Sequence, residues 1–191
     1  MSAELKLVAG VDEVGRGPLI GSVVAAACIL PSEYDLPNLM DSKKLTEKKR
    51  SVLNELIRSQ AVAWSIAEAS AGEVDEINVL QASLLAMKRA VETLGSQPEF
   101  VLVDGNKLPQ WRYQAQAIVG GDGSEPCISA ASILAKVYRD QQMIELGKQY
   151  PQYGFERHKG YPTKQHMEAL KEYGFLPEHR KTFGPVKKLI V

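Results

Sequence analysis

Two adjacent carboxylates, Asp12 and Glu13, lie in the segment Gly-Val-Asp-Glu-Val-Gly-Arg-Gly-Pro, residues 10–18. They follow an apolar run over residues 5–11, which predicts a buried strand. The Gly-Arg-Gly-Pro sequence that comes next predicts the end of this strand. A strand end that presents acids beside a permissive backbone is suited to holding a divalent cation against a phosphate.

A plain polar turn is the simpler interpretation of the same segment, and an Asp-Glu pair alone would favour it. The two glycines beside Arg16 favour a binding site, because Gly15 and Gly17 allow a backbone to approach a ligand closely.

Two other predicted strands also end near an acid. The apolar run 100–104 ends at Asp104, and the run 114–119 is followed by Gly-Gly-Asp-Gly, which contains Asp122. Turn chemistry could explain each of these acids singly. Three acid-bearing strand ends are less expected from turns, and ligands of open sheets bind outside strand ends. Adjacent acids in a continuing strand would point to opposite faces, so we expect the turn after Glu13 to let the four acids converge.

Four clustered carboxylates would repel one another unless a cation neutralised them. Oxygen ligands without His or Cys favour Mg²⁺ or Mn²⁺ over zinc. Two such ions about 4 Å apart are a known device for in-line attack of water on a phosphodiester. The acids therefore predict a metal-dependent phosphodiesterase.

The composition is that of an ordinary globular protein of 191 residues with zero formal net charge, which fits a single domain. No apolar run is long enough to span a membrane, and the first residues lack a secretory pattern, so we expect a cytoplasmic protein. The two cysteines, Cys28 and Cys127, are predicted to be buried free thiols, because neither belongs to a Cys-x-x-Cys pair.

The elements that must position the acids alternate between strands and helices. Further strands are predicted over 22–30 and 61–69, and helices over 46–58, 78–94, 128–146 and 163–173. This order indicates an α/β domain with a mixed sheet and a helical C-terminal part.

Six motifs make the chain resemble the bacterial type 2 ribonucleases H (ribonucleases HII) over residues 7–188. They are Gly-Val-Asp-Glu-Val-Gly-Arg-Gly-Pro (10–18), Asp-Ser-Lys-Lys-Leu (41–45), Val-Asp-Gly-Asn (103–106), Ile-Ser-Ala-Ala-Ser-Ile-Leu-Ala-Lys-Val (128–137), His-Lys-Gly-Tyr-Pro-Thr (158–163) and Phe-Gly-Pro-Val-Lys (183–187). Several long motifs in this order are highly specific.

The resemblance implies one ribonuclease H-like domain over residues 1–191, with a central mixed β-sheet flanked by helices and a helical extension over about 151–191. It implies an endonuclease that hydrolyses the RNA strand of RNA–DNA hybrids. It also implies incision 5′ of single ribonucleotides embedded in duplex DNA, giving 5′-phosphate and 3′-hydroxyl ends. The implied cofactor is Mg²⁺ or Mn²⁺, two ions with substrate bound, and the implied state is a monomer without a membrane partner.

The same resemblance assigns roles to individual residues. The catalytic, metal-binding acids are then Asp12, Glu13, Asp104 and Asp122. The segment Gly15, Arg16 and Gly17 matches the part that recognises the ribose 2′-hydroxyl, and Tyr161 matches a tyrosine that packs on the sugar beside it. Phosphate contacts are expected from Lys43, Lys44 and Lys136. For Lys136 the alternative is a side chain that lies along apolar surface and carries no contact.

One segment departs from the family pattern. The family commonly has a lysine before the fourth acid and a basic residue soon after it, whereas this chain has Gly120-Gly121-Asp122-Gly123-Ser124. We expect weaker substrate affinity or a mobile fourth ligand as a result.

Other candidates have simpler interpretations. The histidines His158, His166 and His179 have no chelating partner at metal spacing, so surface or hydrogen-bonding roles are expected. Trp64 and Trp111 could stack on bases, although packing in the core is the commoner role.

Two other functions remain as alternatives. One is another metal nuclease or strand transferase on the same fold, which would lack the Gly-Arg-Gly segment and Tyr161. The other is a non-catalytic module that binds hybrids, against which the four intact acids argue. A nucleotide-binding switch is disfavoured because no Gly-x-x-x-x-Gly-Lys-Ser/Thr loop occurs.

Overall fold

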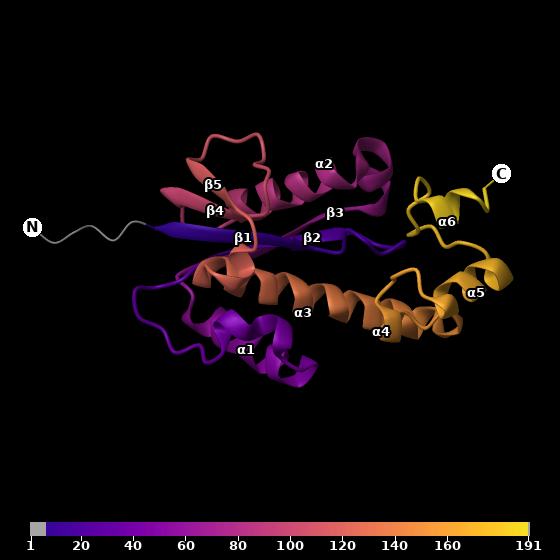
Figure 1. The fold of residues 1–191 in the computed structure, drawn as a ribbon, viewed down its shortest axis with the longest axis horizontal. Helices are drawn as coiled ribbons and strands as arrows, with labels where there is room; N and C mark the ends of the chain where they lie inside the picture. The colour runs from indigo at the N-terminus through magenta and orange to yellow at the C-terminus, as the bar shows by residue number, and fades with distance from the viewer. Residues whose placement is uncertain (1–6, 191) are drawn as a thin grey trace, which may run out of the picture.

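A five-stranded mixed sheet lies at the centre of the computed structural model, which describes residues 7–190 except for the side chains of residues 41–43 (Figure 1). Its strands, in the order β3-β2-β1-β4-β5, are β1 (Val8–Val14), β2 (Val23–Ile29), β3 (Ala63–Ala69), β4 (Phe100–Asp104) and β5 (Ala115–Ile118). The first three strands pair antiparallel, whereas β1, β4 and β5 run parallel. The mixed sheet predicted from the sequence is therefore confirmed.

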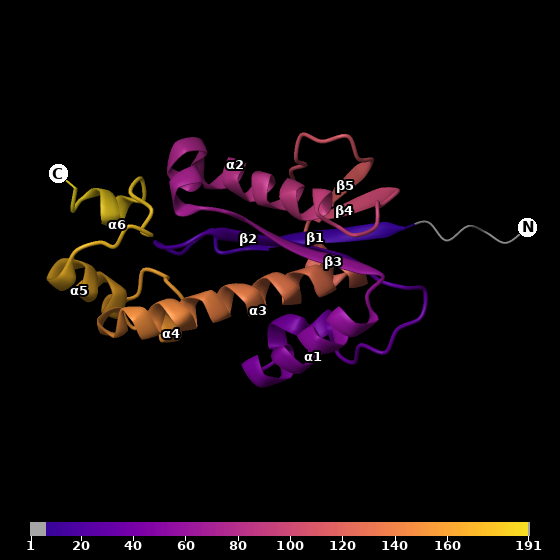
Figure 2. The same cartoon turned by 180° about the vertical axis from the view of Figure 1, so that it is seen from behind.

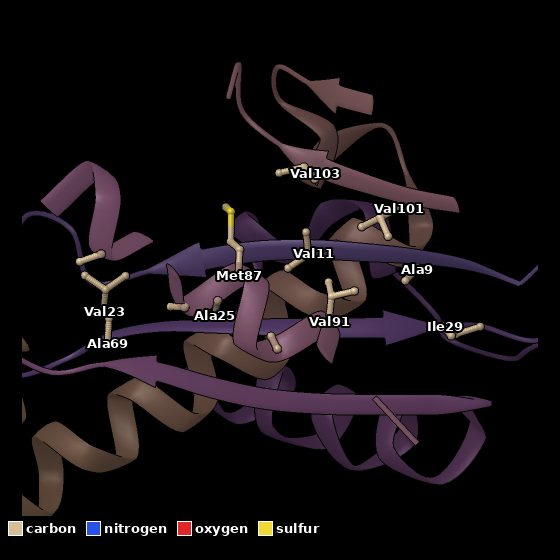
Figure 3. Close-up of a cluster of buried hydrophobic side chains, with 14 of the residues drawn as sticks. Ala9, Val11, Val23, Ala25, Ile29, Ala69, Met87, Val91, Val101 and Val103 are labelled. Atoms are coloured by element: carbon tan, nitrogen blue, oxygen red, sulfur yellow. The ribbon is translucent and has the colours of Figure 1, made fainter. Parts of the chain in front are cut away.

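Helices cover both faces of this sheet (Figures 1 and 2). The helix α2 (Ala71–Glu92) packs on one face, and α1 (Glu47–Gln60) and α3 (Pro126–Gln149) lie on the other. Strand β2 reads Val-Val-Ala-Ala-Ala-Cys-Ile and is buried along its whole length, as expected for a central strand covered on both sides. Figure 3 shows the core on the α2 side, where Val11, Val101 and Val103 pack near Met87 and Val91.

Helix α3 approaches the sheet closely at Gly10. A Cβ atom at this position would lie 2.2 Å from the backbone of Cys127 and Ile128, at the start of α3. Only glycine leaves room for this contact, which fixes where α3 begins relative to β1.

The C-terminal part consists of short helices at one end of the molecule, past the end of the sheet (Figure 1). They are η3 (Pro151–Tyr153), α4 (Phe155–His158), α5 (Lys164–Tyr173) and α6 (Gly184–Lys187). An isolated bridge between Ile20 and His179 joins this part to the segment after β1. A buried cluster that includes Ile20, Met143 and Phe155 packs the two parts together.

The end of β1 agrees with the sequence prediction. The strand runs through Asp12 and Glu13 to Val14, paired with β2, and stops directly before the Gly-Arg-Gly-Pro segment. Residues 5 and 6 of the predicted strand lie outside the described residues.

The helix predicted over 78–94 corresponds to the second half of α2, and the first half was not predicted. Helix α2 begins at Ala71, where Ser70 and Glu73 form a capping box. Asn78, with φ of 67°, interrupts the helix, and its side chain accepts the N–H groups of Leu80 and Gln81. The apolar periodicity marks only the second half.

Within the described residues no helix is long and apolar enough to cross a membrane.

Candidate active site

The four acids singled out in the sequence line one cavity of about 400 Å³. Asp12 and Glu13 come from β1 and Asp104 from the end of β4, while Asp122 lies in η2 (Gly121–Gly123) just after β5. Val11 pairs with Val103 in the parallel ladder, so Asp12 and Asp104 are the next residues of two neighbouring strands. The topology therefore brings together acids that are up to 110 residues apart in the chain.

Asp12 and Glu13 both reach the cavity although they are neighbours in a continuing strand. The paired part of β4 stops at Val103, level with Val11, so β1 extends past its neighbour. Its last residues thus lie at an open edge, where side chains from both faces can border the same space. The stagger of the two strands thus places Asp12 and Glu13 near the end of β1, two residues before the Gly-Arg-Gly-Pro segment begins.

Burial makes the acids of β1 hard to ionise. The Asp12 side chain is buried, and burial raises its pKa to about 8, helped by the charges of Glu13 and Asp104 and opposed by a hydrogen bond with Ser132. Burial also raises the pKa of Glu13, although the Arg16 guanidinium, 3.3 Å from Glu13 Oε1, opposes it. Asp12 is therefore largely protonated at neutral pH unless a cation enters the cavity.

The donor set of the cavity consists of hard oxygen ligands, which suit Mg²⁺ or Mn²⁺. Within the described part of the chain, no three His, Cys, Asp or Glu side chains already stand in a closed metal-binding arrangement. The acids border the cavity instead. A cation bound there would favour the ionised form of Asp12, which burial and the neighbouring carboxylates disfavour.

A second feature, the segment Gly15, Arg16 and Gly17, adjoins the acids directly. Gly15 adopts a φ of 91°, which favours glycine, and Arg16 pairs with Glu13. A Cβ atom on Gly17 would lie 3.0 Å from Cε1 of Tyr161, so the ring packs closely against this glycine. Tyr161 remains 43% exposed, which leaves part of its surface open to a ligand. The structure thus brings Tyr161 to the Gly-Arg-Gly segment across 144 residues of chain.

The predicted lysines are placed differently from one another. Lys136 lines the acid cavity, where its Nζ lies 2.7 Å from Oδ1 of Asp140, so it does more than cover apolar surface. Lys44 is exposed in η1 (Leu39–Lys44). The side chain of Lys43 lies outside the described residues.

Comparison with known proteins identifies the family. The family model described as ribonuclease HII matches residues 9–185. The chain belongs to the ribonuclease HII family. It is 57% identical over 185 residues to ribonuclease HII of Neisseria meningitidis serogroup A, with 96% of this chain and 95% of that protein covered. The ribonuclease HII of Neisseria gonorrhoeae shows the same identity and coverage.

A solved structure shows the same fold. The ribonuclease H2 from Pyrococcus horikoshii OT3 superposes with a TM-score of 0.79 at 28% identity, covering 95% of this chain and 96% of that one. The predicted ribonuclease H-like fold and the assignment as an endoribonuclease are therefore confirmed.

Sequence reasoning missed two polar residues of this cavity, Arg50 and Ser132. Arg50 stands in α1 and donates to the carbonyl of Leu45, 3.0 Å away. Ser132 lies in the Ile-Ser-Ala-Ala-Ser motif of α3, one turn before Lys136. The motif over residues 128–137 could have indicated Ser132. Arg50 could not be distinguished from the other basic residues of α1 by sequence alone.

The segment around Asp122, where the sequence was expected to depart from the family pattern, is held by two hydrogen bonds. The Asp122 N–H donates to Asp104 Oδ1 over 3.3 Å, and the Ser129 hydroxyl donates to the Asp122 carbonyl over 2.5 Å. A Cβ on Gly121 would lie 2.6 Å from Cδ1 of Ile128, so a lysine there would disturb the packing of α3. A basic residue fits better at Gly123, where a Cβ would meet nothing within 4 Å.

The remaining candidates are structural. The histidines are not on the surface: His158, His166 and His179 are buried and hydrogen-bonded in the C-terminal part. The indole of Trp64 packs in the core below Arg58, and Trp111 packs at the edge of the α2-side core, so the packing role is confirmed. Cys28 is buried and Cys127 half-buried, and both are free thiols.

Proposed function

We propose that this chain hydrolyses the RNA strand of RNA–DNA hybrids and incises duplex DNA 5′ of a single embedded ribonucleotide, leaving 5′-phosphate and 3′-hydroxyl ends. Membership of the ribonuclease HII family supports the first activity. The observation that carries the second is the ion pair between Glu13 and Arg16, which joins the acid cavity to the segment that packs against Tyr161.

The cofactor in this proposal is Mg²⁺ or Mn²⁺, two ions with substrate bound, held by Asp12, Glu13, Asp104 and Asp122. When bound, such cations polarise the attacking water and neutralise charge on the leaving 3′ oxygen. The protein holds the acids in place: β1 and β4 fix Asp12 and Asp104 side by side, and the Asp122 N–H ties η2 to Asp104.

Cationic groups on the cavity wall would hold the nucleic acid. Arg50 and Lys136 border the acids and can contact backbone phosphates, which position a duplex without reading its sequence. We assign the phosphate role to these two residues together with Lys43 and Lys44.

Recognition of the ribose depends on the 2′-hydroxyl, because this group alone distinguishes RNA from DNA at one nucleotide. The backbone of Gly15, Arg16 and Gly17 is free of bulky side chains at both glycines and would bond the hydroxyl. The exposed part of the Tyr161 ring would pack on the neighbouring sugar.

A duplex with one ribonucleotide, compared with the identical all-DNA duplex, tests the proposal in the presence of Mg²⁺ or Mn²⁺. We expect a single cut 5′ of the ribonucleotide, no cut in the control, and no cut when EDTA removes the cation. End labelling before and after phosphatase treatment would identify the 5′-phosphate. Equal cutting of both duplexes would indicate another metal nuclease, and binding without any cut would indicate a non-catalytic module.

We propose that the protein acts as a single-domain monomer. Light scattering during gel filtration at assay concentration should give a mass near 21.0 kDa.

A further inference from the structure

Arg180 is fully buried beneath the segment that follows β1, and its guanidinium is bonded to main-chain carbonyls. Its Nη2 donates to the Gly15 carbonyl over 2.6 Å, and its Nη1 donates to the carbonyls of Arg16 and Pro18 over 2.9 and 2.8 Å. Its Nε donates to the Gly21 carbonyl over 3.0 Å. One side chain from the far end of the sequence thus holds four carbonyls of one short segment.

The backbone around Arg180 is held just as firmly. The Arg180 N–H donates to the Leu19 carbonyl and the Gly21 N–H to the Glu178 carbonyl, both over 2.8 Å. On its other side, Asp75 of α2 accepts the N–H groups of Lys181 and Thr182 at 2.8 Å. Hydrogen bonds on both sides therefore fix the backbone that carries the Arg180 guanidinium.

The charge on Arg180 is retained despite its burial. Burial, together with the nearby Arg139, lowers the pKa of Arg180 to about 10, so the guanidinium is protonated at neutral pH. Arg139 is itself buried and donates to the Ile20 carbonyl over 2.6 Å. Carbonyl oxygens solvate the Arg180 cation, and hydrogen bonds from a charged donor are stronger than neutral ones.

Binding of the carbonyls fixes the direction of the neighbouring N–H groups. The described chain has no cis peptide bond, so each C=O points opposite to the N–H of the same peptide unit. The carbonyls of Gly15 and Arg16 point to Arg180, and the N–H groups of Arg16 and Gly17 therefore point away from it. Within the described residues neither N–H donates to another protein group.

We propose that Arg180 is a positioning residue for ribose recognition: by holding the carbonyls of Gly15 and Arg16, it aims the N–H groups of Arg16 and Gly17 at the 2′-hydroxyl. This inference rests on the proposed function, in which the Gly-Arg-Gly segment reads that hydroxyl. The role of Arg180 is distinct from contact with substrate, because its side chain has no exposed surface.

The substitution Arg180→Lys tests this role, since lysine keeps the charge but cannot reach four carbonyls with a planar fork. The readout is the dissociation constant for an all-DNA duplex divided by that for the same duplex with one ribonucleotide. Ca²⁺ replaces Mg²⁺ so that neither duplex is cut. We expect the ratio to fall about tenfold while the affinity for the all-DNA duplex stays within about twofold, because phosphate contacts are unchanged.

Arg89→Lys is the matched control. Arg89 also donates to a main-chain carbonyl, that of Glu68, and pairs with Glu73, but it lies away from the Gly-Arg-Gly segment. Its substitution should leave the ratio unchanged. If circular dichroism shows that Arg180→Lys does not fold, Asp75→Asn serves instead. This substitution weakens the hydrogen bonds that Asp75 accepts from Lys181 and Thr182 and keeps the Arg180 guanidinium. A smaller fall of the ratio in the same direction is then expected.

The outcomes separate the two proposals. A wild-type protein that neither prefers nor incises the ribonucleotide-containing duplex would overturn the proposed function and this inference with it. Wild-type discrimination that persists in Arg180→Lys, or in Asp75→Asn where that variant is decisive, would overturn the positioning role alone. Parallel loss of both affinities would also overturn it, because that result indicates a purely structural residue.

Discussion

At the scale of single residues, the acid cavity contains a carboxyl group whose ionised form is destabilised. Asp12 is buried beside Glu13 and Asp104, and the unfavourable burial of its charge raises its pKa to about 8. Such a residue reduces the stability of the free protein and is retained for a reason other than folding. In the proposed function, binding of a cation gives that reason.

Asp12→Asn should abolish hydrolysis, with at least a ~10³-fold loss, which corresponds to about 4 kcal/mol of transition-state stabilisation. The same variant should be more stable than the wild type in EDTA. Because folding raises the pKa of Asp12 above its unfolded value, the wild type loses stability as pH rises from about 4 through about 8. The difference in melting temperature between Asp12→Asn and the wild type should therefore increase from pH 5 to pH 8.

Asp35→Asn, at an exposed carboxylate, is the control for this pair of measurements and should change neither activity nor the pH trend. A destabilised Asp12→Asn protein, or one that still cuts, would contradict the interpretation of the cavity.

Gly123→Lys should restore a basic side chain beside Asp122 without a clash. We expect a lower KM for nucleic acid, an unchanged kcat, and a salt dependence of binding that is steeper by about one unit of slope, as for one added phosphate contact. Gly123→Gln controls for side-chain size. An equal gain from both variants would show that charge is not the cause.

At the scale of elements, the site depends on how closely α3 approaches β1. Helix α3 carries Ser132 and Lys136 to the cavity, and its first turn rests on Gly10. The positions of Ser132 and Lys136 thus depend on the absence of a side chain at Gly10 of β1.

Gly10→Ala should therefore destabilise the protein by about 1–3 kcal/mol, because its Cβ would meet rigid backbone at 2.2 Å and α3 would have to move. Urea unfolding measures the loss. Hydrolysis should fall at a temperature where the variant is still folded, since Ser132 and Lys136 shift with the helix. Gly95→Ala, at a position where a Cβ meets nothing within 4 Å, should leave both quantities nearly unchanged.

The sequence predicted these elements to different extents. Strand β4 was predicted with its observed bounds, β1 ends at the predicted Gly-Arg-Gly-Pro segment, and the helices predicted from Thr46 and Thr163 begin there, because such signals are local. The stagger between β1 and β4 was not predictable, since it is a property of two strands about 90 residues apart.

At the scale of the whole molecule, a cluster of histidines stabilises the C-terminal part. Nε2 of His166 lies 3.1 Å from Nε2 of His179, and His158 stacks on His166. Burial lowers the pKa of His166 to about 4 and that of His179 to about 3. The cluster also holds the segment of Tyr161, whose carbonyl bonds Nδ1 of His166.

These lowered pKa values predict acid sensitivity of this part. Because the folded state resists protonation of His166, this residue contributes its full stabilisation above the unfolded pKa of about 6.5. The contribution is lost as pH falls toward 4. For His166 this loss is about 2 kcal/mol at pH 5. Hydrogen exchange should show residues 151–187 opening more readily at pH 5 than at pH 7, after correction for intrinsic rates.

His179→Gln isolates the histidine contribution from that of Asp12, whose pH trend is opposite in sign. The variant should be less stable than the wild type at pH 7, and the difference should narrow at pH 5, where the wild type loses its advantage. A difference that is constant with pH would contradict a role for histidine protonation.

The contacts of Arg180 have a consequence for the newly made chain. All four acids lie within the first 122 residues, whereas the guanidinium that holds the Gly15–Pro18 turn arrives 58 residues later. A nascent chain therefore contains every proposed cation ligand before Arg180, the proposed positioning residue for ribose recognition, is added. A product truncated before residue 180 would carry the four acids without the side chain that holds the Gly-Arg-Gly segment.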